Sequence, residues 1–224
     1  MKIVVINGSP KGKAGNTNVM VDAFLKGARE AGAETVNVFL AEKEIEHCKG
    51  CHVCWSKGPG QCVTQDDALG VLGLMGGADV IAFASPVYFG NISGRLKVFM
   101  DRMTMIGSPH SPDYKSEGKE SPGTASPQGP KLMMISSCGH PDKDEFDVTS
   151  LWIRKVAQKL HMELAGELYA AGSRLLTAAP KELQPSVDKY LQVLEKAGKE
   201  LAEERKLSPE TVLLLEQGII PDKA

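Results

Sequence analysis

The chain has 224 residues, enough to bury a sizeable core in one domain or in a domain with an appendage. Its formal net charge of -2 gives no electrostatic reason to expect nucleic acid or an anionic membrane surface as a partner. The N-terminal residues read as a strand without a signal region, and no run is long enough to span a bilayer, so we expect a cytoplasmic protein.

The first predicted strand covers residues 2–7 and leads into a loop rich in small polar residues. Residues 17–32 then carry apolar side chains at helical spacing, with Asn16 as the expected cap. A strand, a small polar loop and a helix start are typical of a phosphate site, because the helix terminus presents unpaired N–H groups. The spacing matches neither the dinucleotide nor the nucleoside-triphosphate fingerprint. An ordinary connection capped by Asn16 would carry the same residues, so this turn alone leaves both interpretations open.

The rest of the chain alternates between strand and helix patterns. The long irregular stretch at 106–130 is dense in Ser, Pro and Gly, which is typical of an active-site lid or of disorder. We therefore predict an α/β fold: a doubly wound, five-stranded parallel sheet with helices on both faces over residues 1–178, and a C-terminal helical extension over 179–224. Further strands are expected at 35–40, 79–85, 131–137 and 163–171, and further helices at 66–76, 92–105, 145–160, 181–205 and 208–215.

Sheets of this kind bind ligands outside the carboxyl ends of their strands, at the point where the strand order reverses. The informative loops are therefore those after the first, third and fourth strands, at residues 9–17, 86–91 and 136–140. All three are rich in small, hydroxyl-bearing or backbone-donor residues. Their agreement on one sheet edge favours a ligand site there over three ordinary connections.

Four of the five cysteines, Cys48, Cys51, Cys54 and Cys62, lie in the loop of residues 47–63. An intracellular chain keeps its thiols reduced, so this grouping indicates metal or redox chemistry rather than disulfides. Evenly spaced cysteines suit an iron–sulfur cluster, because one tight loop can wrap three corners of a cube. Structural zinc prefers two Cys-x-x-Cys knuckles with a longer spacer. A cluster is thus favoured over zinc and over a regulatory disulfide.

Three segments together resemble a known family. Gly8-Ser9-Pro10-Lys11 with Gly15-Asn16-Thr17, the run from Ser85 to Asn91 and the run from Leu96 to Arg102 are similar to segments of the NADPH-dependent FMN reductase group of flavodoxin-like proteins. With the four cysteines added, the chain resembles the iron–sulfur flavoproteins within that group. The resemblance covers residues 1–175, and its cysteine set implies a [4Fe-4S] cluster, although relatives in the wider group also retain such cysteines without one.

The resemblance implies that FMN binds at the sheet edge. Its phosphate would lie on the opening turn and its isoalloxazine ring against residues 86–91, where backbone donors tune a flavin. The family often has arginine where this chain has Lys11, and lysine lacks the bidentate fork. We interpret Asp101 and Arg102 as a helix-end ion pair or subunit contact, and expect no catalytic acid or base. The implied FMN-binding residues are Ser9, Lys11, Asn16, Thr17, Pro86, Val87, Tyr88, Phe89, Gly90, Asn91, Ser136, Ser137, Cys138 and Gly139.

The function implied is an FMN-dependent oxidoreductase that passes electrons from a ferredoxin-type carrier or NAD(P)H to a small-molecule acceptor, by way of the cluster. The first alternative is an NAD(P)H-dependent FMN or quinone reductase with unmetallated cysteines. The second is a non-catalytic zinc-stabilised sensor or scaffold, which leaves the three convergent loops unexplained. The family also implies a homodimer or homotetramer, and we expect neither nucleic acid nor membrane as a partner.

Overall fold

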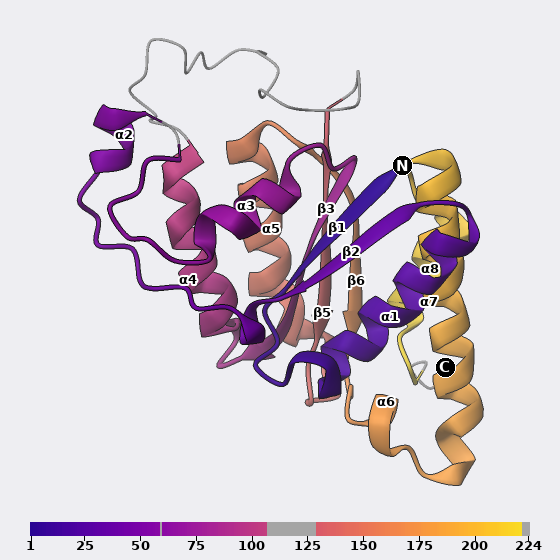
Figure 1. Cartoon of the computed structure of the whole chain (residues 1–224). Coiled ribbons are helices and arrows are strands. Elements are labelled where there is room, and N and C mark those ends of the chain that lie inside the picture. The colour runs from indigo at the N-terminus through magenta and orange to yellow at the C-terminus, as the bar shows by residue number, and fades with distance from the viewer. Residues whose placement is uncertain (59, 107–128, 221–224) are drawn as a thin grey trace.

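The computed structural model describes residues 1–58, 60–106 and 129–220, and in these residues five strands form a parallel sheet with helices on both faces (Figure 1). The strands are β1 (Lys2–Asn7), β2 (Glu34–Phe39), β3 (Val80–Tyr88), β5 (Lys131–Ser137) and β6 (Glu163–Ala170). A short β4 (Asn91–Ile92) pairs antiparallel with the end of β3. The order β2-β1-β3-β5-β6 is that of flavodoxin-like folds, so the predicted sheet is confirmed.

The central strands are buried on both faces. β3 is buried from Val80 to Val87, and β5 is buried over its whole length. Both sequences are nearly continuous apolar runs, as expected of parallel strands that helices cover on each side. The continuous apolar sequence of these two strands therefore indicates that they lie in the middle of the sheet.

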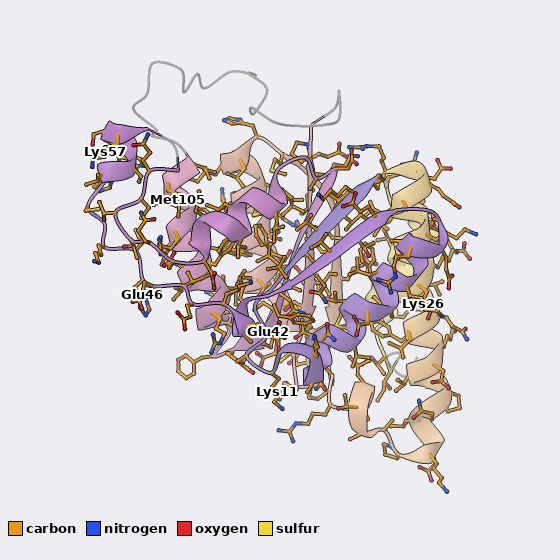
Figure 2. All side chains as sticks on the ribbon, in the orientation of Figure 1. Lys11, Lys26, Glu42, Glu46, Lys57 and Met105 are labelled. Carbon is orange, nitrogen blue, oxygen red and sulfur yellow. The ribbon has the colours of Figure 1, made fainter. Side chains whose placement is uncertain are left out.

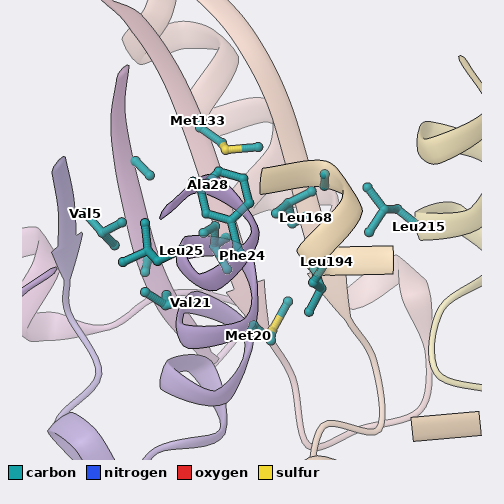
Figure 3. Packing of buried hydrophobic residues seen from close by; sticks show 14 of the residues in the cluster. Val5, Met20, Val21, Phe24, Leu25, Ala28, Met133, Leu168, Leu194 and Leu215 are labelled. Carbon is teal, nitrogen blue, oxygen red and sulfur yellow. The ribbon is translucent and has the colours of Figure 1, made fainter. Parts of the chain in front are cut away.

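One face of the sheet carries α1 (Asn16–Glu30) and α7 (Gln184–Glu204), with α8 (Pro209–Gln217) beside α7 (Figure 1). Side chains from these helices and from the sheet form one hydrophobic cluster. The C-terminal helices are present as predicted and share this core, while the division of the chain at residue 179 stays a prediction. Figure 3 shows members of the cluster, among them Val5, Met20, Phe24, Met133, Leu168, Leu194 and Leu215.

Helices α1 and α7 approach each other closely at two glycines. A Cβ atom at Gly27 would lie 1.8 Å from the Glu195 carbonyl oxygen, and one at Gly198 would lie 1.9 Å from the Phe24 carbonyl oxygen. Both distances are far below any van der Waals contact, so a side chain at either position would force the helices apart. These glycines set the separation of the helix layer over β1, β3 and β5.

The opposite face carries α3 (Ala68–Met75), α4 (Gly94–Arg102) and α5 (Asp147–Leu160), packed over a second hydrophobic cluster. Two further helices are short: α2 (Val53–Lys57) in the cysteine loop and α6 (Leu175–Ala178) after β6. Neither is predicted from the sequence, because segments of this length carry too few apolar repeats to show a helical period. The other boundaries agree with the predicted ones within three residues.

The segment 86–91 differs from its prediction as a loop. β3 continues to Tyr88 and returns through β4, so the segment is a β-hairpin. Phe89 and Gly90 occupy the turn with φ of 51° and 75°, and two successive positive values match the two-residue turn that suits right-handed strand twist. The usual sequence signal for such a turn is Asn-Gly, and this segment has Phe-Gly instead.

The predicted lid over 106–130 lies outside the described residues except for residues 106, 129 and 130. Across the three described segments, no helix combines the length and hydrophobicity that crossing a bilayer requires.

Candidate functional site

The three loops predicted to form a ligand site follow adjacent strands. β1 lies beside β3 and β3 beside β5, with Asn7 in register with Ala84, and Ser85 in register with Ser136. Because β2 pairs with the other side of β1, the strand order reverses between β1 and β3. We call residues 8–17, 85–93 and 136–140 the carboxyl edge. The structure brings the predicted loops together at the place where open α/β sheets bind ligands.

Buried hydroxyl groups connect the loops of the carboxyl edge. The Thr17 and Ser137 hydroxyl oxygens lie 2.7 Å apart, which joins the first loop to the third. The Ser136 hydroxyl donates to the Ser85 carbonyl oxygen at 2.8 Å, which joins the third loop to the second. All four residues are at most 3% exposed. Each pairing satisfies polar groups that would be costly to bury alone, so the edge is held in one arrangement.

Helix α1 starts at the carboxyl edge without a side-chain cap. Its N-cap is Gly15, which has no side-chain hydrogen bond, and Asn16 is already the first helical residue. The prediction that Asn16 caps the helix is therefore wrong, because its side-chain oxygen accepts a hydrogen bond from the Thr177 hydroxyl at 2.9 Å. The Asn18 N–H donates to the Gly15 carbonyl oxygen at 2.9 Å, whereas the N–H groups of Asn16 and Thr17 have no intrahelical acceptor. The positive end of the helix dipole faces the opening turn. An anion suits this position.

Two glycines keep side chains out of the opening turn. A Cβ atom at Gly8 would lie 2.6 Å from the Leu96 Cβ, and one at Gly15 would lie 2.5 Å from the Ser9 Oγ. Ser93 caps α4, accepting from the Leu96 N–H at 3.2 Å and donating to the Gly8 carbonyl oxygen at 2.6 Å. The turn is thus packed against α4, and glycine is needed at both positions because a side chain would collide with Leu96 or Ser9.

The remaining predicted flavin residues differ in exposure. Lys11 is exposed at the turn, and Pro86 and Val87 are buried in β3. At the hairpin, Tyr88 is 47% exposed and Phe89 is fully exposed. Gly90, Asn91 and Gly139 are also exposed, whereas Ser9 and Cys138 are buried. The hairpin therefore projects two aromatic side chains from the carboxyl edge into solvent.

The four clustered cysteines line a pocket that is separate from the carboxyl edge, and we call it the cysteine pocket. Cys48 and Cys51 are exposed, Cys62 is half-buried and Cys54 is buried, and all four are free thiols. Burial raises the pKa of the Cys54 thiol, and negative charge on the other three cysteines raises it further. The wall of the pocket is completed by Lys49, Gly50, His52, Val63, Thr64, Arg102, Thr104 and Met105.

Arg102 at the end of α4 and Thr104 in the turn after it contact three of the four cysteines. The Arg102 Nη2 donates to the Cys62 Sγ at 3.4 Å. The Cys54 Sγ donates to the Thr104 carbonyl oxygen at 3.9 Å, and the Cys48 Sγ lies 3.8 Å from the Thr104 Oγ1. The Trp55 Nε1 donates to the same carbonyl oxygen at 3.0 Å, so α2 is also attached there. The cysteine loop thus packs against residues 102–104.

Arg102 forms a buried ion pair with Asp66 rather than an exposed helix-end pair. The two side chains are 2% and 5% exposed, whereas the neighbouring Asp101 pairs with Lys97 at the surface. Burial alone would raise the pKa of the Asp66 carboxyl group, but the Arg102 guanidinium and two backbone N–H groups hold it below its ordinary value. The same guanidinium, with the Thr64 backbone N–H, outweighs burial at Cys62 and lowers the pKa of that thiol.

Sequence reasoning missed this pair. Asp66 reads as a residue at a helix start, where a carboxylate is usual, and it does accept from the Ala68 N–H at 3.0 Å. Its second role, binding an arginine 36 residues away, has no local signal. An arginine in the last turn of α4 is equally ordinary. Only the packing of α4 against the cysteine loop reveals that both charges are buried together.

The carboxyl edge and the cysteine pocket lie at opposite ends of α4. The helix starts beside Gly8 and ends at Arg102, and its nine residues span about 14 Å. Figure 2 shows the same separation: Lys11 lies at the end of the molecule near the start of α1, and Lys57 and Met105 lie at the other. Within one chain, the carboxyl edge and the cysteine pocket therefore contact different ends of this helix.

The residues present fit both predicted groups in kind. Four thiols line one pocket, and the carboxyl edge offers a helix terminus without a side-chain cap together with hydroxyl groups. In the part of the chain that the structure describes, no three His, Cys, Asp or Glu side chains form a ready metal site. The cysteine pocket thus has the ligand chemistry of a cluster site without its finished geometry.

Comparison with known proteins agrees with the resemblance noted in the sequence. An iron-sulfur flavoprotein of Archaeoglobus fulgidus is 40% identical over 117 residues, which are 52% of this chain and 51% of that protein. An iron-sulfur flavoprotein of Methanocaldococcus jannaschii is 44% identical over 102 residues, 46% of this chain and 51% of that protein. The chain thus matches about half the length of these curated relatives.

Solved structures share the fold at low sequence identity. An FMN-dependent NADH-azoreductase from Bacillus anthracis, solved with FMN, has a TM-score of 0.63 at 18% identity and covers 90% of this chain and 99% of its own. The NAD(P)H:quinone oxidoreductase from Methanothermobacter marburgensis has a TM-score of 0.61 at 16% identity and covers 90% and 96%. The model of the NADPH-dependent FMN reductase family matches residues 1–119. The chain belongs to the NADPH-dependent FMN reductase family.

Proposed function

We propose that this protein is an FMN-dependent oxidoreductase with an NAD(P)H or ferredoxin-type electron donor and a small-molecule acceptor. The observation that carries the proposal is the convergence of three loops on one sheet edge, held together by the Thr17–Ser137 and Ser136–Ser85 hydrogen bonds. A mononucleotide suits the edge because it offers one anion position, at the start of α1, and no dinucleotide fingerprint.

The phosphate of FMN would bind at the start of α1. The N–H groups of the first turn and the hydroxyl groups of Ser9 and Thr17 are the donors there, and Lys11 adds a positive charge. Ser9 and Thr17 are buried, so their orientation is fixed before the ligand arrives. Such preorganisation lowers the entropic cost of binding.

The isoalloxazine ring would lie between the hairpin of residues 86–91 and the segment 136–139. The exposed side chains of Tyr88 and Phe89 supply aromatic surface, and the fixed hairpin supplies backbone groups at the ring edge. The same exposed aromatic residues support a homodimer or homotetramer, because a partner subunit would cover them. Sedimentation of the purified protein tests this point, and a monomer at micromolar concentration would contradict it. A cytoplasmic location stays a prediction.

We further propose that Cys48, Cys51, Cys54 and Cys62 hold a [4Fe-4S] cluster. All four line one pocket, and the relatives that match this chain are named iron-sulfur flavoproteins. When bound, FMN accepts an electron pair with a hydride, whereas an iron–sulfur cluster carries single electrons. Arg102 and Thr104 would orient three of the four thiolates through their contacts with Cys62, Cys54 and Cys48.

A reductase of FMN or quinones with unmetallated cysteines is the second candidate. It is favoured by the exposure of Cys48 and Cys51 and by the lack of a formed metal site in the described residues. In that case the carboxyl edge alone would perform the reaction, with NAD(P)H as donor.

Anaerobic purification with quantitation of FMN, iron, sulfide and zinc separates these candidates. One FMN with iron and labile sulfide per chain, and flavin bands with a broad shoulder in the visible spectrum, are the expected result. FMN without iron would support the second candidate. Zinc without flavin would contradict both and favour a zinc-stabilised scaffold. Mixing the protein with NADH, NADPH or reduced ferredoxin, and following the flavin absorbance, then identifies the donor.

A further inference from the structure

Arg102 has one of the largest fully buried side chains in the described structure, and this side chain carries a positive charge. A buried charge is costly unless a partner and further hydrogen bonds compensate it. Arg102 lies at the end of α4 away from the carboxyl edge, so the proposed flavin site does not explain why the charge is there. Its surroundings are the cysteine loop.

The two terminal nitrogens of the Arg102 guanidinium bind residues at both ends of that loop. Nη1 contacts the Asp66 carboxylate and donates to the Glu46 carbonyl oxygen at 3.0 Å. Nη2 donates to the Thr64 carbonyl oxygen at 3.3 Å and to the Cys62 Sγ at 3.4 Å. Glu46 precedes the first cysteine of the loop, and Cys62, Thr64 and Asp66 form its end.

Asp66 extends the same connection to the backbone. Its Oδ2 also accepts from the Glu46 N–H at 2.9 Å, and its Oδ1 accepts from the Ala68 N–H at 3.0 Å. Arg102 and Asp66 therefore bring the two ends of the cysteine loop together through both N–H and carbonyl groups of Glu46. Next to this connection, Asp67 donates to the Glu44 carbonyl oxygen at 3.0 Å and accepts from the Glu44 N–H at 2.9 Å. No strand lies between β2 and β3 in the described residues, so the ends of the loop are joined by these few contacts.

We infer that Arg102 is a positioning residue for the proposed cluster: it closes the cysteine loop and places one positive charge against the Cys62 sulfur. The inference rests on the proposed function, because it assigns Cys62 as a cluster ligand. Hydrogen bonds and charges at the cysteine sulfurs are among the factors that set the reduction potential of a cluster. Uptake of one electron adds one negative charge, so Arg102 favours the reduced state and raises the potential.

Arginine is required because of its shape as well as its charge. The planar fork reaches Asp66, Glu46, Thr64 and Cys62 at once, whereas a lysine ammonium would donate from one point. The two parts of the inference can thus be tested separately: lysine keeps the charge and loses the fork, and glutamine loses the charge.

The test compares Arg102→Gln, Arg102→Lys and the control Lys97→Gln, all purified anaerobically. Lys97 lies on the same helix with 56% of its side chain exposed, so its replacement removes an equal charge far from sulfur. Iron and sulfide per chain and the midpoint potential of the cluster are measured by dye-mediated titration. The amount of FMN bound per chain shows whether each variant keeps its fold, because the carboxyl edge is at the other end of α4 from Arg102.

We expect Arg102→Gln to lower the equilibrium constant for one-electron reduction of the cluster about tenfold. The midpoint potential would then become about 59 mV more negative. Arg102→Lys should shift it less, and Lys97→Gln should match the wild type. If Arg102→Gln loses iron that Lys97→Gln retains, the result supports the loop-closing role of Arg102. The effect on the midpoint potential is then measured in Arg102→Lys. Equal iron and equal potential in Arg102→Gln and Lys97→Gln would overturn the inference.

A second measurement distinguishes failure of this inference from failure of the proposed cluster. If the wild type holds no iron, the cluster proposal fails, but Arg102 can still be tested in the metal-free protein. Hydrogen exchange of backbone amides in residues 44–67 should then be faster in Arg102→Gln than in Lys97→Gln, because the loop ends separate. Equal exchange in the two variants would show that Arg102 does not close the loop.

Discussion

The carboxyl edge and the cysteine pocket are built in different ways. At the carboxyl edge, the ends of three adjacent strands fix each loop, and buried hydroxyl groups such as those of Thr17 and Ser137 join the loops. The cysteine pocket is formed by a loop whose only regular element among the described residues is the five-residue α2. The buried ion pair Asp66–Arg102 holds this loop to α4, and hydrogen bonds from Trp55 and Gly60 attach it to the turn that follows α4.

This difference implies different stabilities. A site at the ends of buried strands opens only when the sheet itself opens, whereas a loop held by few contacts can open locally. We therefore expect the carboxyl edge to share the global stability of the domain and the cysteine pocket to open at lower cost.

Asp66→Ala should open the cysteine pocket while leaving the carboxyl edge unchanged. Removing the carboxylate leaves the Arg102 charge buried without its ionic partner, which costs about 3–5 kcal/mol for a buried pair. The effect is expected in native-state hydrogen exchange of residues 44–67. FMN content should stay at the wild-type level.

Asp101→Ala is the matched control for this experiment. Asp101 pairs with Lys97 across one helical turn at the surface, and such a pair contributes about 0.5 kcal/mol or less. Equal exchange rates in the two variants, or loss of FMN from Asp66→Ala, would show that the two sites are not held independently.

Replacing Asn16 by Leu together with Thr17 by Val should abolish FMN retention and leave the fold intact. A hydrogen bond to a charged group contributes about 1.5–3 kcal/mol, so loss of the Thr17 hydroxyl alone would weaken phosphate binding tenfold or more. Flavin released on gel filtration measures the effect, and circular dichroism verifies the fold. Thr177→Val serves as control, because it removes the partner of Asn16 without touching the opening turn. Unchanged flavin occupancy in the double variant would refute the phosphate assignment.

Gly8→Ala should destabilise the carboxyl edge by about 1–3 kcal/mol, the usual cost of overpacking. Its Cβ would lie 2.6 Å from the Leu96 Cβ, so the opening turn and α4 must move apart. Gly94→Ala is the control. It adds a methyl group to α4 itself, where no atom outside the neighbouring helix backbone lies within 4 Å, and alanine is a better helix former than glycine. Urea denaturation of both variants is the measurement. A Gly8→Ala midpoint as high as that of Gly94→Ala would mean that the turn is not tightly packed.

The contrast between the two sites also explains what the sequence could predict. Thr17, Ser136 and Ser137 were predictable as neighbours, because the order of strands and helices in the chain determines which loops share a sheet edge. The spacing of the cysteines predicted that they would gather, and all four line one pocket. Arg102 and Asp66 were not predictable as partners, since each is an ordinary residue at a helix end and only tertiary packing buries them together. The hairpin at Phe89 was missed because Phe-Gly carries no turn signal.

The smallest expected effect is a pH dependence that belongs to the cysteine pocket alone. The folded-state pKa of Asp66 lies below its ordinary value of 3.8, so its contribution to stability is fully present above that value. The contribution is lost as the pH falls through the folded-state pKa, because protonation removes the negative partner of Arg102. The hydroxyl and carbonyl groups that join the carboxyl edge do not titrate in this range.

Hydrogen exchange of the metal-free protein between pH 6 and pH 3 tests this expectation. Protection of residues 44–67 should stay constant down to about pH 4 and then fall before that of α1, since the pKa of Asp66 is depressed. In Asp66→Asn the loop should be less protected at pH 6, with no further step at acid pH from this position. If the loop and α1 lose protection together in the wild type, the cysteine pocket opens only with the whole domain, and the two sites are one cooperative unit.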